Sequence, residues 1–152
     1  MVDESGAAPH LPWSDSFNVG VDVLDTDHRA LVAQINTVCA AWHIGLRAEA
    51  LQALASLCTL AGAHFGREEA VLRDLTGYLA LEAHTGEHRS RMTQLTALRQ
   101  RFHEAADGDM QLCTDLIDWF VRQSIGHDAA IKAHFDDRGA RFAARPRPRK
   151  AS

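Results

Sequence analysis

Histidines and carboxylates at helical spacing are the residues of this sequence best suited to carry chemistry. The segment 64–68 has a His and a Glu four residues apart, and the segment 84–88 has two His four residues apart. On an α-helix, residues four apart lie about 40° from each other around the axis and one turn along it, so both can reach one small object. A further His comes earlier in the chain and an Asp later. The candidate set is His28, His64, Glu68, His84, His88 and Asp128.

The types of these side chains indicate a transition-metal site. Imidazole together with carboxylate suits Fe, Mn or Zn. The cysteines, Cys39, Cys58 and Cys113, are too far apart in the sequence for a structural zinc site, and we expect them to be buried and reduced. Four histidines and a glutamate exceed what one tetrahedral ion needs. A pair of ions bridged by carboxylates uses the surplus.

Four helical segments must position these residues. Apolar residues recur at helical spacing over about 25–44, 48–75, 81–106 and 110–137. Gly45, Gly77 and Gly108 mark the breaks, and Asp109 is a candidate N-cap of the last helix. Because the breaks are short, consecutive helices should be antiparallel neighbours. The sequence predicts an all-α protein, an antiparallel up-down-up-down four-helix bundle with an extended N-terminal arm.

We expect the chain to have three parts. Residues 1–23 form the extended arm, with Trp13 and Phe17 laid against the helices, and residues 24–137 form the bundle. Residues 138–152 are basic and interrupted by prolines, which favours a disordered tail.

Composition and charge indicate a cytoplasmic protein. The formal net charge of -4 gives no sign of a nucleic-acid partner. No apolar run reaches the roughly 18 residues that a membrane span needs. The N-terminus lacks the apolar segment of a secretory signal. We therefore expect neither a membrane nor a nucleic acid among its partners.

An ordered set of motifs runs along the chain. Its members are residues 13–21 (WSDSFNVGV), 24–31 (LDTDHRAL), 64–69 (HFGREE), 84–88 (HTGEH), and Trp119-Phe120 followed by Asp128. In their order and spacing, these motifs resemble those of the bacterial hemerythrin family, and the resemblance covers about residues 13–137. Ferritin-like bundles, an alternative with a metal pair, use paired Glu-x-x-His motifs, and none occurs here.

The resemblance implies a non-haem di-iron centre with an oxo or hydroxo bridge. Two pairs of histidines would each ligate one iron, and two carboxylates would bridge the irons: His28 with His64, His84 with His88, and Glu68 with Asp128. Dioxygen would bind in a pocket whose apolar positions Leu31 and Trp119 match. The implied function is dioxygen binding, as a carrier or a sensor, rather than catalysis.

The sequence departs from the family pattern at Gln123, where the family has a His ligand, and at Ser124, where it has a large aliphatic residue. Gln123 could coordinate iron through its amide oxygen or hydrogen-bond a coordinated water, or His127 could replace it from one turn further on. Each arrangement makes the pocket wetter and shortens the retention of oxygen.

This departure keeps other functions open. A di-iron oxidase or peroxidase, or a protein that handles peroxide or nitric oxide, is the main alternative. A helical bundle whose metal site has decayed is a third. A sensory role would require a separate protein partner, which the sequence does not name.

Overall fold

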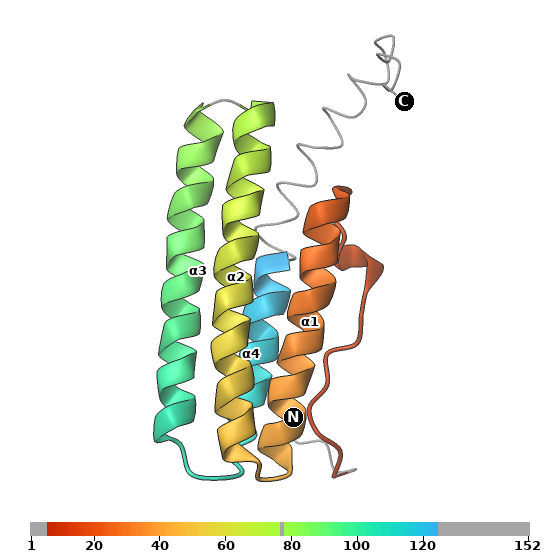
Figure 1. Ribbon diagram of the computed structural model, residues 1–152, viewed down its shortest axis with the longest axis vertical. Helices are drawn as coiled ribbons and strands as arrows, with labels where there is room; N and C mark the ends of the chain where they lie inside the picture. The colour runs from red at the N-terminus through yellow and green to blue at the C-terminus, as the bar shows by residue number, and fades with distance from the viewer. Residues whose placement is uncertain (1–5, 77, 125–152) are drawn as a thin grey trace.

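The computed structural model describes residues 6–76 and 78–124, without the side chains of residues 75–81, 83 and 84. The elements are a 3-10 helix η1 (Asp15–Phe17) and the α-helices α1 (Asp22–His43), α2 (Arg47–Thr76), α3 (Tyr78–Glu104) and α4 (Gln111–Arg122). The helices pack side by side and alternate in direction (Figure 1). Strands are absent from these two ranges. The predicted all-α four-helix bundle is confirmed.

The predicted helix boundaries shift by a few residues. The first helix begins at Asp22 rather than Asp25, and the third at Tyr78 rather than Leu81. The rest of the predicted last helix and the basic tail lie outside the described residues. None of the described helices has the length and apolar character needed to cross a lipid bilayer.

Glycines in the left-handed region close two of the turns. Gly45 has a φ of 80° and Gly108 a φ of 85°, which a residue with a Cβ adopts only with strain. After α1, the N–H of Leu46 donates to the carbonyl of Ala41 at 2.9 Å, which satisfies one of the free carbonyls at the helix end. The N-cap of α4 is Met110 and not the predicted Asp109, although Asp109 accepts the backbone N–H of Gln111 at 3.2 Å. The turns are therefore short enough to enforce antiparallel packing.

Apolar side chains at helical spacing fill the interior. Trp42 and Phe102 meet edge to face, with ring centroids 4.9 Å apart, near the end of the bundle where α1 joins α2. Cys39 and Cys113 are buried and Cys58 is half-buried, all of them as free thiols. The fully buried large side chains include Ile35, Leu54, Leu57, Leu95, Phe102, Leu112, Leu116 and Phe120.

The N-terminal arm is fixed along α1. Asn36 accepts the backbone N–H of Leu11 at 2.7 Å and donates to its carbonyl at 2.9 Å. Trp13 meets Phe17 edge to face at 5.5 Å, and the guanidinium of Arg29 lies 4.4 Å from the centroid of a Trp13 ring. Phe17 is buried. The predicted packing of Trp13 and Phe17 against the helices is confirmed, and it brings the backbone of Phe17 to the start of α1.

Truncating the core should destabilise the bundle. Leu54 is fully buried in α2, so Leu54→Ala should lower the free energy of unfolding by about 2–5 kcal/mol. Gln52→Ala, at an exposed position of the same helix, should change it by less than about 0.5 kcal/mol. Urea denaturation followed by circular dichroism measures both values. Equal effects would contradict the assignment of Leu54 to the core.

Candidate metal centre

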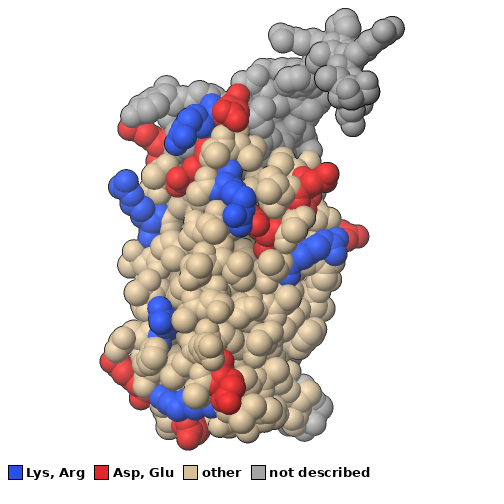
Figure 2. Space-filling view, in the orientation of Figure 1, with Lys and Arg blue, Asp and Glu red and all other residues tan. Residues whose placement is uncertain are grey.

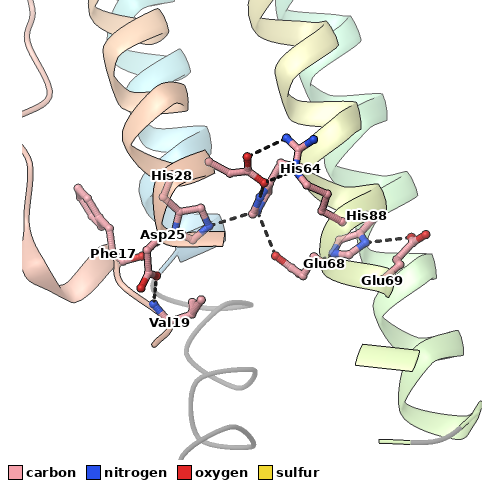
Figure 3. A network of polar contacts seen from close by, with 10 residues as sticks. Phe17, Val19, Asp25, His28, His64, Glu68, Glu69 and His88 are labelled. Atoms are coloured by element: carbon pink, nitrogen blue, oxygen red, sulfur yellow. Dashed lines mark hydrogen bonds and ion pairs between the residues drawn. The ribbon is translucent and has the colours of Figure 1, made fainter. Parts of the chain in front are cut away.

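Three histidines and a glutamate from three helices converge inside the bundle (Figure 3). His28 comes from α1, His64 and Glu68 from α2, and His88 from α3. Their exposed fractions are only 0, 0, 1 and 3%. Possible ligand atoms of His28, His64 and Glu68 lie within 4.8 Å of one another. The His–Glu spacing of four in α2 thus places both side chains at one interior point, as the sequence predicted.

The orientation of each imidazole ring is set by a hydrogen bond from its outer nitrogen, Nδ1. The acceptors are a backbone carbonyl and two carboxylates, so Nδ1 must carry the proton and donate it. In the neutral ring, Nε2 then presents a lone pair to the interior. The three bonds are His28 to the Phe17 carbonyl at 2.6 Å, His64 to Asp27 at 3.1 Å, and His88 to Glu69 at 3.0 Å.

This donor set fits a cation. The Nε2 atoms of His28 and His64 are 3.2 Å apart, and Oε2 of Glu68 is 3.0 Å from Nε2 of His64. Lone pairs and a carboxylate this close together repel one another unless a proton or a metal ion lies among them. Buried imidazole and carboxylate are suitable ligands for iron, manganese or zinc. The residues present therefore suit a metal.

Glu68 divides its two oxygens between two histidines. Oε2 faces His64 on its own helix at 3.0 Å, and Oε1 faces Nε2 of His88 on α3 at 2.8 Å. Each oxygen of the carboxylate thus contacts a different histidine, one on α2 and one on α3. Burial lowers the pKa of His88, but its hydrogen bonds to Glu68 and Glu69 outweigh that effect and raise the pKa above the ordinary value. A proton and a cation would therefore compete for the same nitrogen.

Aromatic rings enclose the histidines. Phe65 stacks on His88 with ring centroids 4.5 Å apart, and Phe120 meets His28 edge to face at 5.8 Å. Phe120 in turn packs against Phe17 of the arm at 5.2 Å. These rings limit the access of water, which strengthens the electrostatic interactions within the cluster.

The last turn described on α4 has a different character. Gln123 is fully buried and Ser124 is 3% exposed, and the chain has π-helical geometry at both. Among the described residues, neither amide atom of Gln123 nor the hydroxyl of Ser124 has a hydrogen-bond partner. Buried polar atoms usually have one, so these three atoms are available to a water molecule or a ligand. Gln123 lies about one turn beyond Phe120, whose ring contacts His28.

The other predicted site residues divide into two groups. Leu31 and Trp119 are buried, and the indole N–H of Trp119 donates to the carbonyl of Arg91 at 3.0 Å. His84 lies on α3, one turn before His88, but its side chain is outside what the structure describes. Asp128 and His127 lie wholly outside the described residues.

The residues that hold the histidines were missed by the sequence reasoning. Asp27, Glu69 and the carbonyl of Phe17 accept the Nδ1 protons, yet none of them was among the predicted site residues. A signal existed in the sequence, because Asp27 precedes His28 and Glu69 follows Glu68 directly. Each acid, however, serves a histidine on the neighbouring helix, and the sequence does not give the register between helices.

Comparison with known proteins agrees with this geometry. The pattern of the hemerythrin HHE cation binding domain matches residues 19–124. The chain belongs to the hemerythrin family. The match spans the three helices that supply the cluster and extends to Ser124, so the convergent histidines and Glu68 lie within a cation-binding domain. The predicted resemblance is confirmed.

Curated relatives of this hemerythrin domain are bacterial. The bacteriohemerythrin of Stenotrophomonas maltophilia (strain R551-3) is 28% identical over 130 residues, which cover 83% of this chain and 84% of the relative. The bacteriohemerythrins of Pseudomonas paraeruginosa (strain DSM 24068 / PA7) and of Pseudomonas aeruginosa (strain LESB58) are each 28% identical over 120 residues, covering 79% of this chain and 78% of the relative. The similarity thus extends over most of both chains.

Replacing Gln123 by an apolar residue should stabilise the metal-free hemerythrin domain. Gln123→Leu removes two buried amide atoms that have no described partner, so the free energy of unfolding should rise by about 1–3 kcal/mol. The matched control is Gln52→Leu at an exposed site, which should change it by less than about 0.5 kcal/mol. Both are measured by urea denaturation in the presence of a chelator. A loss of stability in Gln123→Leu would show that the amide is satisfied in the folded chain.

Proposed function

We propose that this hemerythrin-family protein binds dioxygen at a non-haem di-iron centre, as a carrier or a sensor. The observation that carries the proposal is the set of imidazole Nε2 atoms turned inward around Glu68, with each Nδ1 held by an acceptor. Membership of a cation-binding family supports it. The charge and cysteine content of the chain are consistent with a cytoplasmic location.

In this proposal two histidines serve each iron. His28 and His64, whose Nε2 atoms are 3.2 Å apart, would hold one, and His88 with His84 would hold the other. Glu68 would bridge the pair, which its division between His64 and His88 supports. Asp128 would be the second bridge, with an oxo or hydroxo group completing the centre.

The geometry of α4 supports a contribution from this helix. The chain has π geometry at Gln123 and Ser124, and π turns often occur at functional sites. Both side chains are buried, and their polar atoms have no hydrogen-bond partner among the described residues. The amide of Gln123 is therefore available to the proposed centre.

A ferrous pair, when bound, supplies the two electrons needed to bind dioxygen in reduced form. The chain's own contribution is a rigid and largely dry enclosure. Leu31, Trp119 and Phe120 are buried near the start of α1 and the end of the described α4, and they limit water on that side. Phe120 also fixes the ring of His28 by an edge contact. Excluding water in this way favours reversible binding over irreversible oxidation.

Iron stoichiometry tests the centre. After anaerobic reconstitution with a ferrous salt, the wild-type chain should retain two irons, and exposure to oxygen should produce an absorption change that deoxygenation reverses. Glu68→Gln removes the bridging charge and should reduce the retained iron below two per chain, while circular dichroism shows that the helices persist. Glu104→Gln, at an exposed site of α3, is the control. Undiminished iron binding by Glu68→Gln would contradict the proposed bridge.

The polar turn at Gln123 and Ser124 favours one alternative, a di-iron protein that turns over peroxide or handles nitric oxide. Three buried polar atoms without described partners would attract water to the pocket. A wet pocket would shorten the life of the oxygen-bound protein. Turnover of hydrogen peroxide with a generic reductant by the iron-loaded wild-type chain would favour this alternative over oxygen binding.

Restoring the family residue tests the effect of this turn. Gln123→His should lengthen the half-life of the oxygen-bound protein by about tenfold or more, the effect of roughly 1.4 kcal/mol in the barrier to irreversible oxidation. Stopped-flow absorbance after mixing with aerated buffer measures this half-life. Gln100→His, on the exposed face of α3, should leave it unchanged. An unchanged half-life in Gln123→His would show that the glutamine does not set the lifetime.

A further inference from the structure

Two acidic residues beside the cluster each hold a histidine of the neighbouring helix. Asp27 on α1 accepts the Nδ1–H of His64 on α2 at 3.1 Å. Glu69 on α2 accepts the Nδ1–H of His88 on α3 at 3.0 Å. Figure 3 shows the labelled Glu69 on the outer side of the His88 ring, facing away from Glu68. Both acids thus accept a hydrogen bond from Nδ1, the ring nitrogen that the proposed irons do not use.

Asp27 is itself fixed. The Nε–H of Arg67 donates to its Oδ2 at 2.8 Å, and an Nη2–H donates to its Oδ1 at 2.7 Å. This bidentate ion pair fixes both the position of the carboxylate and the orientation of its plane. The carboxylate is thus held by Arg67 on one side while it accepts the Nδ1–H of His64 on the other.

Most ion pairs on a protein surface contribute little to stability. Such pairs are common on the surface of this protein. Figure 2 shows acidic and basic side chains next to each other at several places on one face. Arg101 and Asp115, which join α3 to α4 at 2.7 Å, form a pair of this kind. Asp27 differs because its side chain is only 13% exposed and because the same Oδ2 that binds Arg67 also accepts the proton of a fully buried histidine.

The third histidine provides a contrast. Nδ1 of His28 donates to the neutral carbonyl of Phe17 rather than to a carboxylate. A carboxylate partner makes an imidazole a stronger donor than a carbonyl partner does, and it also fixes the ring. The histidines around the cluster are therefore unequal, although all three rings are held.

We propose that Asp27, clamped by Arg67, and Glu69 are positioning residues that set the ring orientation and donor strength of His64 and His88. The inference rests on the metal centre of the proposed function. Its distinct content is that the acids next to the ligand positions govern metal affinity without touching the metal. Loss of the carboxylate charge should weaken metal binding by about 10–100-fold, the range found for such outer partners.

The experiment compares Asp27→Asn with Asp115→Asn in the full chain. Each change removes a carboxylate that accepts hydrogen bonds from an arginine of another helix and from a second side chain. For Asp27 the second side chain is His64 of the cluster, and for Asp115 it is Gln111 of its own helix. Anaerobic titration with Co²⁺, followed by its visible absorption bands, gives the dissociation constant. Thermal unfolding with a chelator present gives the stability of the metal-free chain.

Asp27→Asn should raise the Co²⁺ dissociation constant by about 10–100-fold and shift the absorption bands. Asp115→Asn should lower the thermal midpoint of the metal-free chain to a similar extent while leaving the dissociation constant within about twofold. Glu69→Gln should act like Asp27→Asn, through His88. Arg67→Met retains the carboxylate and changes a partly exposed side chain, so it should fold and give a smaller loss of affinity in the same direction.

Equal dissociation constants in Asp27→Asn, Arg67→Met and Asp115→Asn would overturn the inference. If the wild-type chain still bound Co²⁺ in that case, the proposed metal centre would stand without it. A wild-type chain that bound no Co²⁺ and retained no iron would overturn both.

Discussion

The structure depends on one electrostatic constraint, the concentration of electron-pair donors in a buried volume. Three imidazole Nε2 atoms and the carboxylate of Glu68 face one another over 2.8–3.2 Å, with almost no exposure to solvent. Taking a carboxylate out of water costs several kcal/mol unless charge or hydrogen bonds compensate it. The apolar part of the bundle, around residues such as Leu54 and Phe102, must supply the stability that holds this arrangement together.

Adjacent residues divide two tasks between them. His28 faces the cluster while Asp27 reaches across to α2, and Glu68 faces the cluster while Glu69 reaches across to α3. Neighbouring positions on a helix point about 100° apart, so one helix can serve the interior and the next helix at once. The site therefore requires a fixed register between the helices. The packing of the apolar core and the attachment of the N-terminal arm to α1 provide that register.

The sequence contained most of the fold and part of the site. The periodicity of the apolar residues and the breaks at Gly45 and Gly108 were sufficient to predict the bundle, and helical spacing was sufficient to bring His64 and Glu68 together. Asp27 and Glu69 could not be assigned, because which histidine an acid meets on another helix depends on the relative rotation and register of the helices. The role of the Phe17 carbonyl was equally hidden, since a backbone atom leaves no signature in residue type.

The division of the site between helices also indicates where its function can change. On α1, α2 and α3 the rings of His28, His64 and His88 are each fixed by a partner on the outer side, so this part of the site forms a rigid unit. At the end of the described α4, Gln123 and Ser124 are buried without described partners in a turn of π geometry. A substitution there alters the polarity next to the cluster and leaves the hydrogen bonds that orient the histidines intact. Polarity beside the cluster can therefore change at the end of α4 independently of the hydrogen bonds that orient the histidines on α1, α2 and α3.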